Sequence, residues 1–501
     1  MQMKPIKIAI LAMGGEGGGV LADWIVNLGE HNGYFAQTTS VPGVAQRTGA
    51  TIYYVELFPH ASAPAGKAPV LALMPMPGDV DVVLASELME AGRAVQRGLV
   101  TDERTTLIAS THRVYSIAEK SAMGDGRVDN DALIAHATQA SKRFVHFNME
   151  KAAEDSGSVI SAVMFGALAS TGVLPFSRSQ FEQTIERGGV GVKPSLKAFS
   201  AAYARVAEGD AGKDEQAEPA VPVAQLKPRD PAVAKLVERV RAEIPEGAQQ
   251  IVVEGVRRTL DYQDVAYANL YLDRLKQIRQ YARPDDVALM RETGRYLALW
   301  MSYEDAIRVA ELKTRATRFD RVRKEVRAAD GQIVAINEYM HPRVEEISEI
   351  LPFAGVGRWL MRPTWGNKLV KSQTKSGRVI QTSSVRGFIP LYLLSGFKRW
   401  RRRTLRYQAE QQRIETWLKH IQDSADAHPA LALEIAQCQR LVKGYGDTHA
   451  RGLRNYQTVM EALARNESTM SPALLGTLRD AALADEHGKK LEAALRQHAL
   501  V

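Results

Sequence analysis

Five glycines lie in one short stretch near the N-terminus, Met13-Gly-Gly-Glu-Gly-Gly-Gly19. A continuous apolar run, Ile6 to Leu11, precedes them, and a segment with helical spacing, Val20 to Glu30, follows. Glycine lets the backbone approach a ligand closely, and the free N–H groups at a helix N-terminus favour an anion such as phosphate. The stretch therefore predicts a cofactor-binding turn, unless its glycines serve only to let the helix pack on the strand. The candidate residues are Gly14, Gly15, Gly17 and Gly18.

This glycine turn differs from the two common nucleotide-binding loops. Its only match to G-x-G-x-x-G/A, at Gly17, Gly19 and Ala22, begins late and lies partly inside the helix. The next strand candidate, Phe35 to Ser40, lacks the carboxylate that would bind the ribose hydroxyls of a dinucleotide. The chain also contains no G-x-x-x-x-G-K-[ST] sequence. A dinucleotide site therefore fits poorly, and an ordinary ATP-binding loop is excluded.

A second glycine motif, Gly124-Asp-Gly126, is followed 22 residues later by Asn148. It resembles the pattern with which thiamine diphosphate enzymes hold magnesium, but the spacing is short and Met149 replaces the expected second Asn. A turn before Asp129, a good helix N-cap, explains the motif better. No His, Asp and Glu cluster has metal-ligand spacing either. We therefore predict that this chain holds neither thiamine diphosphate nor a metal ion, and that it carries no complete catalytic set.

Cys438 is the only cysteine, so an intramolecular disulfide, a CxxC redox pair and a four-thiolate iron–sulfur cluster are all excluded. It lies in a helical apolar pattern, which favours a buried and unreactive thiol. Any iron–sulfur cluster used in electron transfer would then belong to another chain. The sequence shows no signal peptide and no run of about 18 apolar residues, so we expect a cytoplasmic protein without a membrane span.

The net charge of +8 is unevenly distributed. Residues 1–205 carry 18 Lys and Arg against 19 Asp and Glu, whereas the remaining residues carry 47 against 38. The densest basic run is Lys398-Arg-Trp-Arg-Arg-Arg403, beside the apolar stretch Phe388 to Phe397. Nucleic acid, an anionic membrane surface or an acidic partner could each bind this run, and a solvated helix face is the simpler interpretation.

The order of the expected elements predicts an α/β domain, residues 1–206, followed by a mainly helical region. Short apolar or β-branched runs alternate with helical patterns in this domain, which is typical of an open, mostly parallel sheet. We expect strands at 6–11, 51–57, 81–85, 107–110 and 144–147, and helices at 20–30, 85–97 and 131–142. Residues 207–231, rich in Pro and charge, predict a linker. Residues 232–501 are then mainly helical, with helices at 232–244, 252–279, 284–300 and 303–328 and an interruption at about 351–390.

Three segments of residues 5–205 resemble the gamma domain of 2-oxoacid:ferredoxin oxidoreductases. Lys7 to Ala22 is similar to the opening strand–glycine–helix unit of that domain, which commonly has Gln where this chain has Glu16. Val41-Pro-Gly-Val-Ala-Gln-Arg-Thr-Gly-Ala50 resembles its Gln-Arg-Gly-Gly element, with Thr48 at the first glycine. Asn148 and Ser158 to Ile185 resemble its closing helix, turn and helix. The resemblance thus adds Gln46, Arg47 and Thr48 to the candidate cofactor-binding residues.

The helical region resembles the part that accompanies the indolepyruvate (arylpyruvate) type of this family, which has fused and two-subunit forms. The segments that carry this resemblance are Glu311–Arg315, Asn337–Pro342 and Leu441–Gly452. The chain is thereby similar to the smaller, cluster-free beta subunit of such an enzyme. The resemblance implies that an arylpyruvate such as indolepyruvate or phenylpyruvate is oxidatively decarboxylated, that its acyl group passes to coenzyme A, and that two electrons pass to ferredoxin.

The same resemblance places thiamine diphosphate, magnesium and the iron–sulfur clusters on a larger partner subunit, so that this chain alone would be inactive. The gamma domain would close over the active site and help to bind coenzyme A. This implies a hetero-oligomer that reaches ferredoxin through the large subunit and has no nucleic-acid partner. Two other functions remain open: a stand-alone nucleotide-binding α/β enzyme, and a helical scaffold that binds an anionic partner through its basic half.

Overall fold

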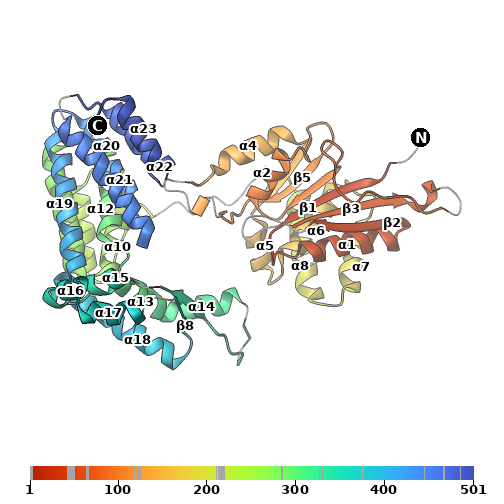
Figure 1. Cartoon of the computed structure of the whole chain (residues 1–501). Coiled ribbons are helices and arrows are strands. Elements are labelled where there is room, and N and C mark those ends of the chain that lie inside the picture. The colour runs from red at the N-terminus through yellow and green to blue at the C-terminus, as the bar shows by residue number, and fades with distance from the viewer. Residues whose placement is uncertain are drawn as a thin grey trace. The chain divides into compact units, whose positions relative to one another are not determined.

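The computed structural model describes residues 4–41, 51–63, 67–116, 119–120, 126–209, 212, 221–283, 286–326, 328–329, 331–341, 343–373, 377–444, 446–466, 469–485 and 487–500. The chain divides into two compact units, Met1–Pro219 and Ala220–Val501. Each unit has its own apolar core (Figure 1).

Within the described part of the first unit, six strands form one sheet with the order β2-β3-β1-β4-β5-β6. The strands are β1 (Ile6–Ala12), β2 (Tyr34–Val41), β3 (Thr51–Pro59), β4 (Val82–Ala85), β5 (Thr106–Ser110) and β6 (Arg143–Phe147). β1, β4, β5 and β6 are parallel, whereas β3 runs antiparallel to both β1 and β2. The prediction of an open, mostly parallel α/β sheet is therefore confirmed, with antiparallel strands on one side.

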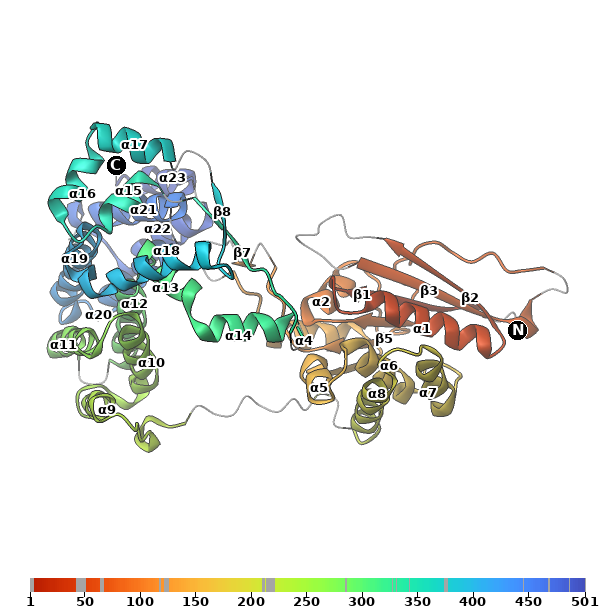
Figure 2. The ribbon, with the colours of Figure 1, turned by 90° about the horizontal axis from the view of Figure 1, so that it is seen from below.

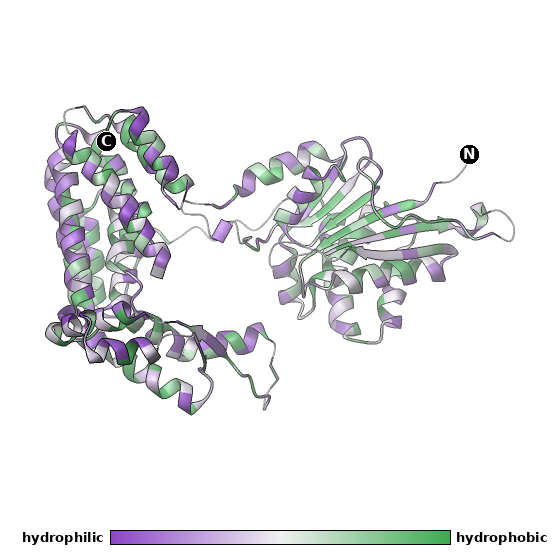
Figure 3. Cartoon of the chain, in the orientation of Figure 1, coloured by the Kyte–Doolittle hydropathy of each residue, from purple (hydrophilic) through white to green (hydrophobic). Residues whose placement is uncertain are grey.

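Helices cover both faces of this sheet (Figures 1 and 2). They are α1 (Gly18–His31), α2 (Leu88–Gln96), α4 (Asn130–Ala140), α5 (Met149–Asp155), α6 (Ile160–Thr171), α7 (Arg178–Arg187) and α8 (Val192–Ala207). Alternate residues of a strand point to opposite faces, so Ile8 and Ile10 pack with α1, α6 and α8, whereas Ala9 and Leu11 pack with α2 and α4. A strand buried on both faces is apolar throughout, as the green colour of the central strands in Figure 3 shows.

Long helices form the core of the second unit (Figure 1). They are α9 (Pro231–Glu243), α10 (Glu246–Tyr262), α11 (Val265–Tyr281), α12 (Val287–Met301), α19 (Leu405–Ala425), α20 (Pro429–Cys438), α21 (Gly446–Arg465), α22 (Pro472–Ala484) and α23 (Lys489–Gln497). Trp300 and Trp417 are buried in this core with their ring centres 5.6 Å apart. Both indole N–H groups find an acceptor, Glu410 for Trp300 and the carbonyl oxygen of Ile435 for Trp417.

Shorter elements connect α12 to α19. They are α13 (Ala306–Thr314), α14 (Ala316–Glu325), α15 (Val344–Glu349), α16 (Ala354–Met361), α17 (Trp365–Gln373), α18 (Val385–Ser395), the 3₁₀ helix η3 (Gly396–Arg403), and an antiparallel pair of β7 (Asn337–Met340) and β8 (Arg378–Gln381). Residues 351–390, where we predicted an interruption of the helices, thus contain short helices and one strand.

Two predicted helices are wrong in their extent. The range 252–279 spans α10 and α11, which are separated at Gln263 and Asp264, and the range 303–328 spans α13 and α14, which are separated at Arg315. Asp264 starts α11 by accepting a hydrogen bond from the backbone N–H of Tyr267 at 2.8 Å. Apolar spacing continues across both breaks, so periodicity alone did not reveal them.

The end of the predicted linker packs on the second unit. α8 ends at Ala207 and α9 begins at Pro231. Between them Val223 is buried, and the guanidinium of Arg241 donates hydrogen bonds to the carbonyl oxygens of Val223 and Leu226 at 2.8 and 2.7 Å. Residues 223–226 are therefore held by α9.

No helix in the described part of the chain is long and apolar enough to cross a lipid bilayer. Cys438 is buried at the end of α20, and burial raises the pKa of its thiol to about 12. The prediction of a buried thiol is confirmed, and a thiol with so high a pKa is a poor nucleophile.

Several groups of the basic run are engaged inside the second unit. Arg401 is 1% exposed and forms a two-point ion pair with the equally buried Asp305, at 2.9 and 3.2 Å. Arg402 pairs with Asp264 at 2.8 Å, and the Lys398 ammonium donates to a backbone carbonyl of α10 at 2.9 Å. The solvated helix face that we considered the simpler interpretation therefore describes only part of the run.

Loss of the Arg401 guanidinium should destabilise the second unit strongly. Arg401→Met leaves the carboxylate of Asp305 buried without its partner, so we expect the free energy of unfolding to fall by about 3–5 kcal/mol. Arg402→Met removes a neighbouring but exposed ion pair and should cost about 0–1 kcal/mol. Urea unfolding followed by circular dichroism measures both. Equal losses for the two variants would contradict the stabilising role of the buried pair.

Candidate functional site

Polar side chains gather where the parallel strands end. Glu16 follows β1, Ser86 follows β4, and Ser110 ends β5 two residues before His112. α1 follows β1 and covers one face of the sheet, whereas α2 follows β4 and covers the other. The connections that leave these neighbouring strands thus run to opposite faces, which makes the space between β1 and β4 a topological switch point. Open α/β sheets bind ligands at such a point, outside the carboxyl ends of the strands. We therefore place the candidate site at the carboxyl ends of these parallel strands.

Ser86 joins the glycine turn to β4. Its hydroxyl accepts a hydrogen bond from the backbone N–H of Met13 at 3.1 Å and donates one to the carboxylate of Glu16. The backbone N–H of Ser86 in turn donates to the carbonyl oxygen of Leu11 at 2.9 Å. These bonds hold the Glu16 side chain at the end of the sheet.

His112 lies beside Glu16. Its Nε2 is 3.5 Å from Glu16 Oε1 and 3.9 Å from Glu150 Oε2. Its Nδ1 is 2.7 Å from Ser110 Oγ, which accepts a hydrogen bond from the backbone N–H of Met149 at 3.0 Å. The imidazole therefore has a defined orientation, with one nitrogen on a hydroxyl and the other facing two carboxylates.

Glu16 and His112 each stabilise the charged form of the other. Burial alone would raise the pKa of Glu16, but the contacts with His112 and Ser86 outweigh it and hold this pKa below its ordinary value. Burial likewise works against a charged imidazole. The contact with Glu16 and the negative charges of Glu150 and Glu87 nevertheless raise the pKa of His112. At neutral pH the site thus contains a carboxylate beside an imidazole that holds its proton more firmly than a free histidine.

Glu87 lies behind this pair at the start of α2. It is 1% exposed, and its carboxylate accepts hydrogen bonds from the backbone N–H groups of Met89 at 3.0 Å and Glu90 at 2.9 Å. Burial raises its pKa. The cap explains why the helix predicted at 85–97 begins only at Leu88.

Two helices begin next to each other at Gly17. Gly17 caps α1 with a φ of 73°, and a Cβ added there would lie 3.0 Å from Oγ of Ser161 in the first turn of α6. Neither helix has an acidic residue in its first turn or a side chain that caps it. Ser161 is 1% exposed, and its hydroxyl has no hydrogen-bond partner among the described residues. Free N–H groups of two helices together with an unsatisfied hydroxyl suit an anion.

The other glycines of the turn have different surroundings. Gly14 and Gly15 are exposed, and a Cβ added to either would meet nothing within 4 Å. Gly18 is buried, and a Cβ there would lie 2.5 Å from the Cβ of Ala12 and 2.8 Å from the ring of Tyr53. Gly14 and Gly15 therefore border open space, whereas Gly18 allows α1 to lie against the sheet.

Gln46, Arg47 and Thr48 lie outside the described residues. The described residues on either side of them belong to strands: β2 ends at Val41, and β3 begins at Thr51. Thr51 pairs with Ala12, the last residue of β1. The described residues that flank this segment therefore lie at the same end of the sheet as the start of the glycine turn.

Several residues of this site were not predicted from the sequence, namely Ser86, Ser110, His112, Glu150 and Ser161. Position gave a signal for some of them, because polar residues follow β1, β4 and β5, and the carboxyl ends of these parallel strands must meet. Asn148 serves as the N-cap of α5, with its side chain accepting a hydrogen bond from the backbone N–H of Lys151 at 2.9 Å. Gly124 and Asp125 of the second glycine motif lie outside the described residues. Across the described ranges, no group of three or more His, Cys, Asp and Glu side chains could hold a metal ion.

Two family models match separate parts of the chain. Residues 7–205 match the family described as "Pyruvate ferredoxin/flavodoxin oxidoreductase". This match lies within the first unit. Its matched residues include the glycine turn, Ser86, His112 and Ser161. Residues 248–462 of the second unit match "Family of unknown function (DUF6537)".

Three solved structures are similar to part of the chain. The pyruvate oxidoreductase subunit PORC of Thermotoga maritima shares 16% identity over 40% of this chain and 97% of its own, with a TM-score of 0.29. The gamma subunit of a keto/oxoacid ferredoxin oxidoreductase from Geobacter sulfurreducens PCA shares 18% identity over 41% of this chain and 99% of its own, with a TM-score of 0.28. The 2-oxoglutarate:ferredoxin oxidoreductase of Magnetococcus marinus shares 16% identity over 41% of this chain and 32% of its own, with a TM-score of 0.30. No curated protein matched the chain.

The imidazole of His112 should titrate above the ordinary histidine value of 6.5. Its raised pKa means that this proton stabilises the folded chain below about pH 6.5, and that the stabilisation is lost as the pH rises through the folded-state pKa. The lowered pKa of Glu16 gives stability above about pH 4.3 that is lost as the pH falls. NMR titration of the His112 ring should show the raised midpoint, and Glu16→Gln should lower it. A midpoint that Glu16→Gln leaves unchanged would disprove the pairing.

Alanine substitutions should distinguish the glycine that packs against the sheet, Gly18, from one that borders open space, Gly14. Gly18→Ala forces a methyl group against Ala12 and Tyr53, so we expect the first unit to lose about 1–3 kcal/mol of unfolding free energy. Gly14→Ala, four residues earlier in the same turn, meets open space and should change stability by less than about 0.5 kcal/mol. Thermal unfolding of both variants tests this difference. A stable Gly18→Ala protein would show that α1 can move away from β1.

Proposed function

We propose that this chain is the cluster-free subunit of an arylpyruvate:ferredoxin oxidoreductase, with indolepyruvate or phenylpyruvate as substrate. The observation that carries the proposal is the anion-suited turn at Gly17 and Ser161 in a domain of the pyruvate ferredoxin/flavodoxin oxidoreductase family. The similarity of residues 311–315, 337–342 and 441–452 to indolepyruvate-type enzymes supports the aryl substrate. The product would be the aryl-acetyl thioester of coenzyme A.

The turn would bind a phosphate group of coenzyme A. The backbone N–H groups at the start of α1 and α6 and the Ser161 hydroxyl are the donors, and Gly14 and Gly15 leave the approach open. Glu16 would repel this phosphate if its charge were uncompensated. A proton on His112, whose pKa is raised beside Glu16, would offset that charge, so the pair would act as a positioning device for the turn.

The remaining chemistry would belong to the assembled enzyme. Thiamine diphosphate with magnesium on the large subunit would supply the decarboxylation, and its iron–sulfur clusters would carry electrons to ferredoxin. On this chain we propose that Gln46, Arg47 and Thr48 face the shared active site. The guanidinium of Arg47 could bind a carboxylate of the substrate or partner, or a cofactor phosphate, through two parallel hydrogen bonds, which lysine cannot copy.

An exposed apolar face on α18 supports the need for a partner. Val385, Ile389, Tyr392 and Leu393 recur at helical spacing, and each is between 49% and 72% exposed. Residues 351–409 around them contain 13 Lys and Arg and no Asp or Glu. Contiguous apolar surface on a soluble protein marks an interaction site, and the surrounding charge favours an acidic partner. We propose that the large subunit covers this face.

The purified chain should be colourless and inactive, because one thiol cannot hold an iron–sulfur cluster. We expect dye reduction with indolepyruvate and coenzyme A only after the large subunit is added. In the assembled enzyme, Ser161→Ala should raise the KM for coenzyme A about 10-fold, equivalent to about 1.4 kcal/mol, without changing that for indolepyruvate. Ser179→Ala, an exposed serine on α7, is the control. Turnover by the chain alone would refute the subunit role, and equal KM changes for both substrates would refute the phosphate site.

A charge on the exposed face of α18 should weaken assembly. Leu393→Asp places a carboxylate within an apolar contact opposite an acidic surface, so we expect at least about 10-fold weaker binding of the large subunit. Val326→Asp introduces the same charge at another exposed apolar position of the second unit and should have no effect. Biolayer interferometry with an immobilised large subunit measures both affinities. Unchanged affinity of Leu393→Asp would place the interface elsewhere.

A further inference from the structure

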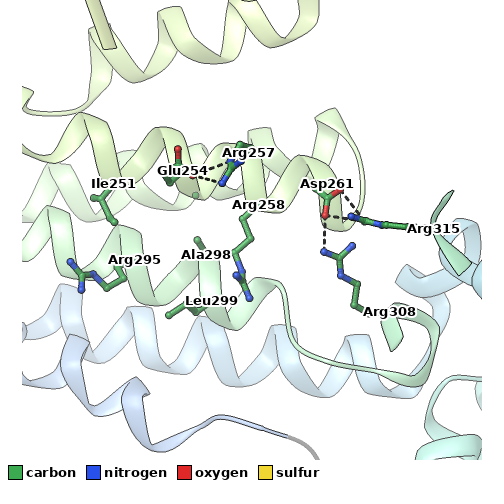
Figure 4. A pocket seen from close by; sticks show the side chains of 11 residues that line it. Ile251, Glu254, Arg257, Arg258, Asp261, Arg295, Ala298, Leu299, Arg308 and Arg315 are labelled. Carbon is green, nitrogen blue, oxygen red and sulfur yellow. Dashed lines mark hydrogen bonds and ion pairs between the residues drawn. The ribbon is translucent and has the colours of Figure 1, made fainter. Parts of the chain in front are cut away.

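The second unit contains a cavity of about 520 Å³ that is separate from the site described above (Figure 4). Residues of α10, α12 and α13 line it. Its apolar part is formed by Ile251, Ala298 and Leu299, and guanidinium groups of several arginines border it. Small-molecule sites in proteins commonly have volumes of about 300–1,000 Å³ with an apolar lining and a few polar groups. The size and lining of this cavity therefore suit a small organic molecule.

Five arginines and only two acidic residues line the cavity, so its formal charge is strongly positive. The arginines are Arg257, Arg258, Arg295, Arg308 and Arg315, and the acids are Glu254 and Asp261. Figure 4 shows Arg308 and Arg315 converging on Asp261, at 2.7 and 3.0 Å, and Arg257 pairing with Glu254 at 2.8 Å. The two acids of the lining are thus already engaged by Arg257, Arg308 and Arg315, and neither is paired with Arg258 or Arg295.

Arg258 on α10 is the least compensated of these groups. It makes no hydrogen bond or ion pair with any residue that the structure describes. Its side chain is exposed at the cavity, and partial desolvation together with the nearby positive charge of Arg308 lowers its pKa, with Glu304 and Asp261 opposing them only in part. Arg295 on α12, on the other side of the apolar lining, reaches only Glu292, at 3.7 Å. Arg258 thus has no described partner, and Arg295 has a single long ion pair that a ligand could replace.

We propose that this cavity binds an organic oxyanion, a phosphate or carboxylate with a small apolar group. Arg258 and Arg295 would hold the oxyanion, since a guanidinium presents paired N–H donors that match planar carboxylate or phosphate oxygens. Ala298 and Leu299, one turn of α12 further along, would contact the apolar group. Asp261, which pairs with both Arg308 and Arg315, keeps the far wall in place and leaves these two arginines less available.

An extended polyanion such as nucleic acid fits the cavity less well. The positive groups surround a concave space of about 520 Å³, whereas a nucleic acid contacts basic side chains spread along a surface. The apolar lining also has no use in phosphate-backbone binding. The ligand is therefore a compact molecule.

Calorimetry on the full-length chain tests this site with defined probes. Phenyl phosphate should bind more tightly than inorganic phosphate if the apolar lining takes part, and a comparison of pyrophosphate with citrate distinguishes a phosphate from a carboxylate ligand. Arg258→Gln and Arg295→Gln should each weaken the preferred probe at least 10-fold. Arg465→Gln, which removes an exposed arginine from α21, is the charge-matched control and should bind as the wild type does.

Thermal unfolding without a probe separates binding from structure. Arg258→Gln should leave the melting temperature unchanged or raise it, because it removes a guanidinium that has no partner and is repelled by Arg308. The preferred probe should stabilise the wild type and the Arg465→Gln variant but not the Arg258→Gln variant. The proposal is overturned if no probe binds the wild type more tightly than it binds Arg258→Gln. It is also overturned if Arg258→Gln, measured without a probe, has a lower melting temperature than the wild type.

Discussion

The close approach of α1 to the sheet at Gly18 is the constraint on which the candidate site depends. With only 2.5 Å between a hypothetical Cβ and that of Ala12, no other residue lets the helix begin directly at the end of β1. This contact fixes where the preceding residues can lie. Glu16 then reaches Ser86 on the neighbouring strand, and Gly17 meets the first turn of α6. The turn, the carboxylate and the two helix N-termini come together because one position has no side chain.

The parallel sheet and the α/β fold class could be predicted from the sequence, because strands that are buried on both faces have a recognisable residue pattern. A parallel strand with two covered faces is a short, continuous apolar run, and such runs correspond to β1, β4 and β5. The site was harder to predict, since its residues come from separate turns that only the strand order brings together. His112 is distant in sequence from Glu16, and its partner became evident only once β5 was known to lie two strands from β1. The glycine turn was predictable because all of its features are local.

Buried charge organises the second unit in a way that composition does not reveal. The sequence shows a basic run at 398–403, and an average over it suggests one positive surface. In the structure, Arg401 points inward to Asp305 while its neighbour Arg402 stays half-exposed. Glu410, fully buried one turn after the start of α19, joins Arg406, Arg413 and Trp300. A buried charge is tolerated only with such partners, so these residues specify how η3 meets the start of α13 and how α19 meets α12.

The departure from the family pattern at Glu16 becomes understandable through charge. The gamma domains that this chain resembles commonly have a neutral Gln at that position, and a lone carboxylate there would oppose an anion at the start of α1. His112, with its Nε2 3.5 Å from Glu16 and its pKa raised by that contact and by the charges of Glu150 and Glu87, offsets the Glu16 carboxylate whenever its ring is protonated. The pair differs from glutamine in one respect: it titrates. The charge at the turn therefore changes when His112 loses its proton, and the positions of Glu16 and His112 must be considered as one unit rather than as two substitutions.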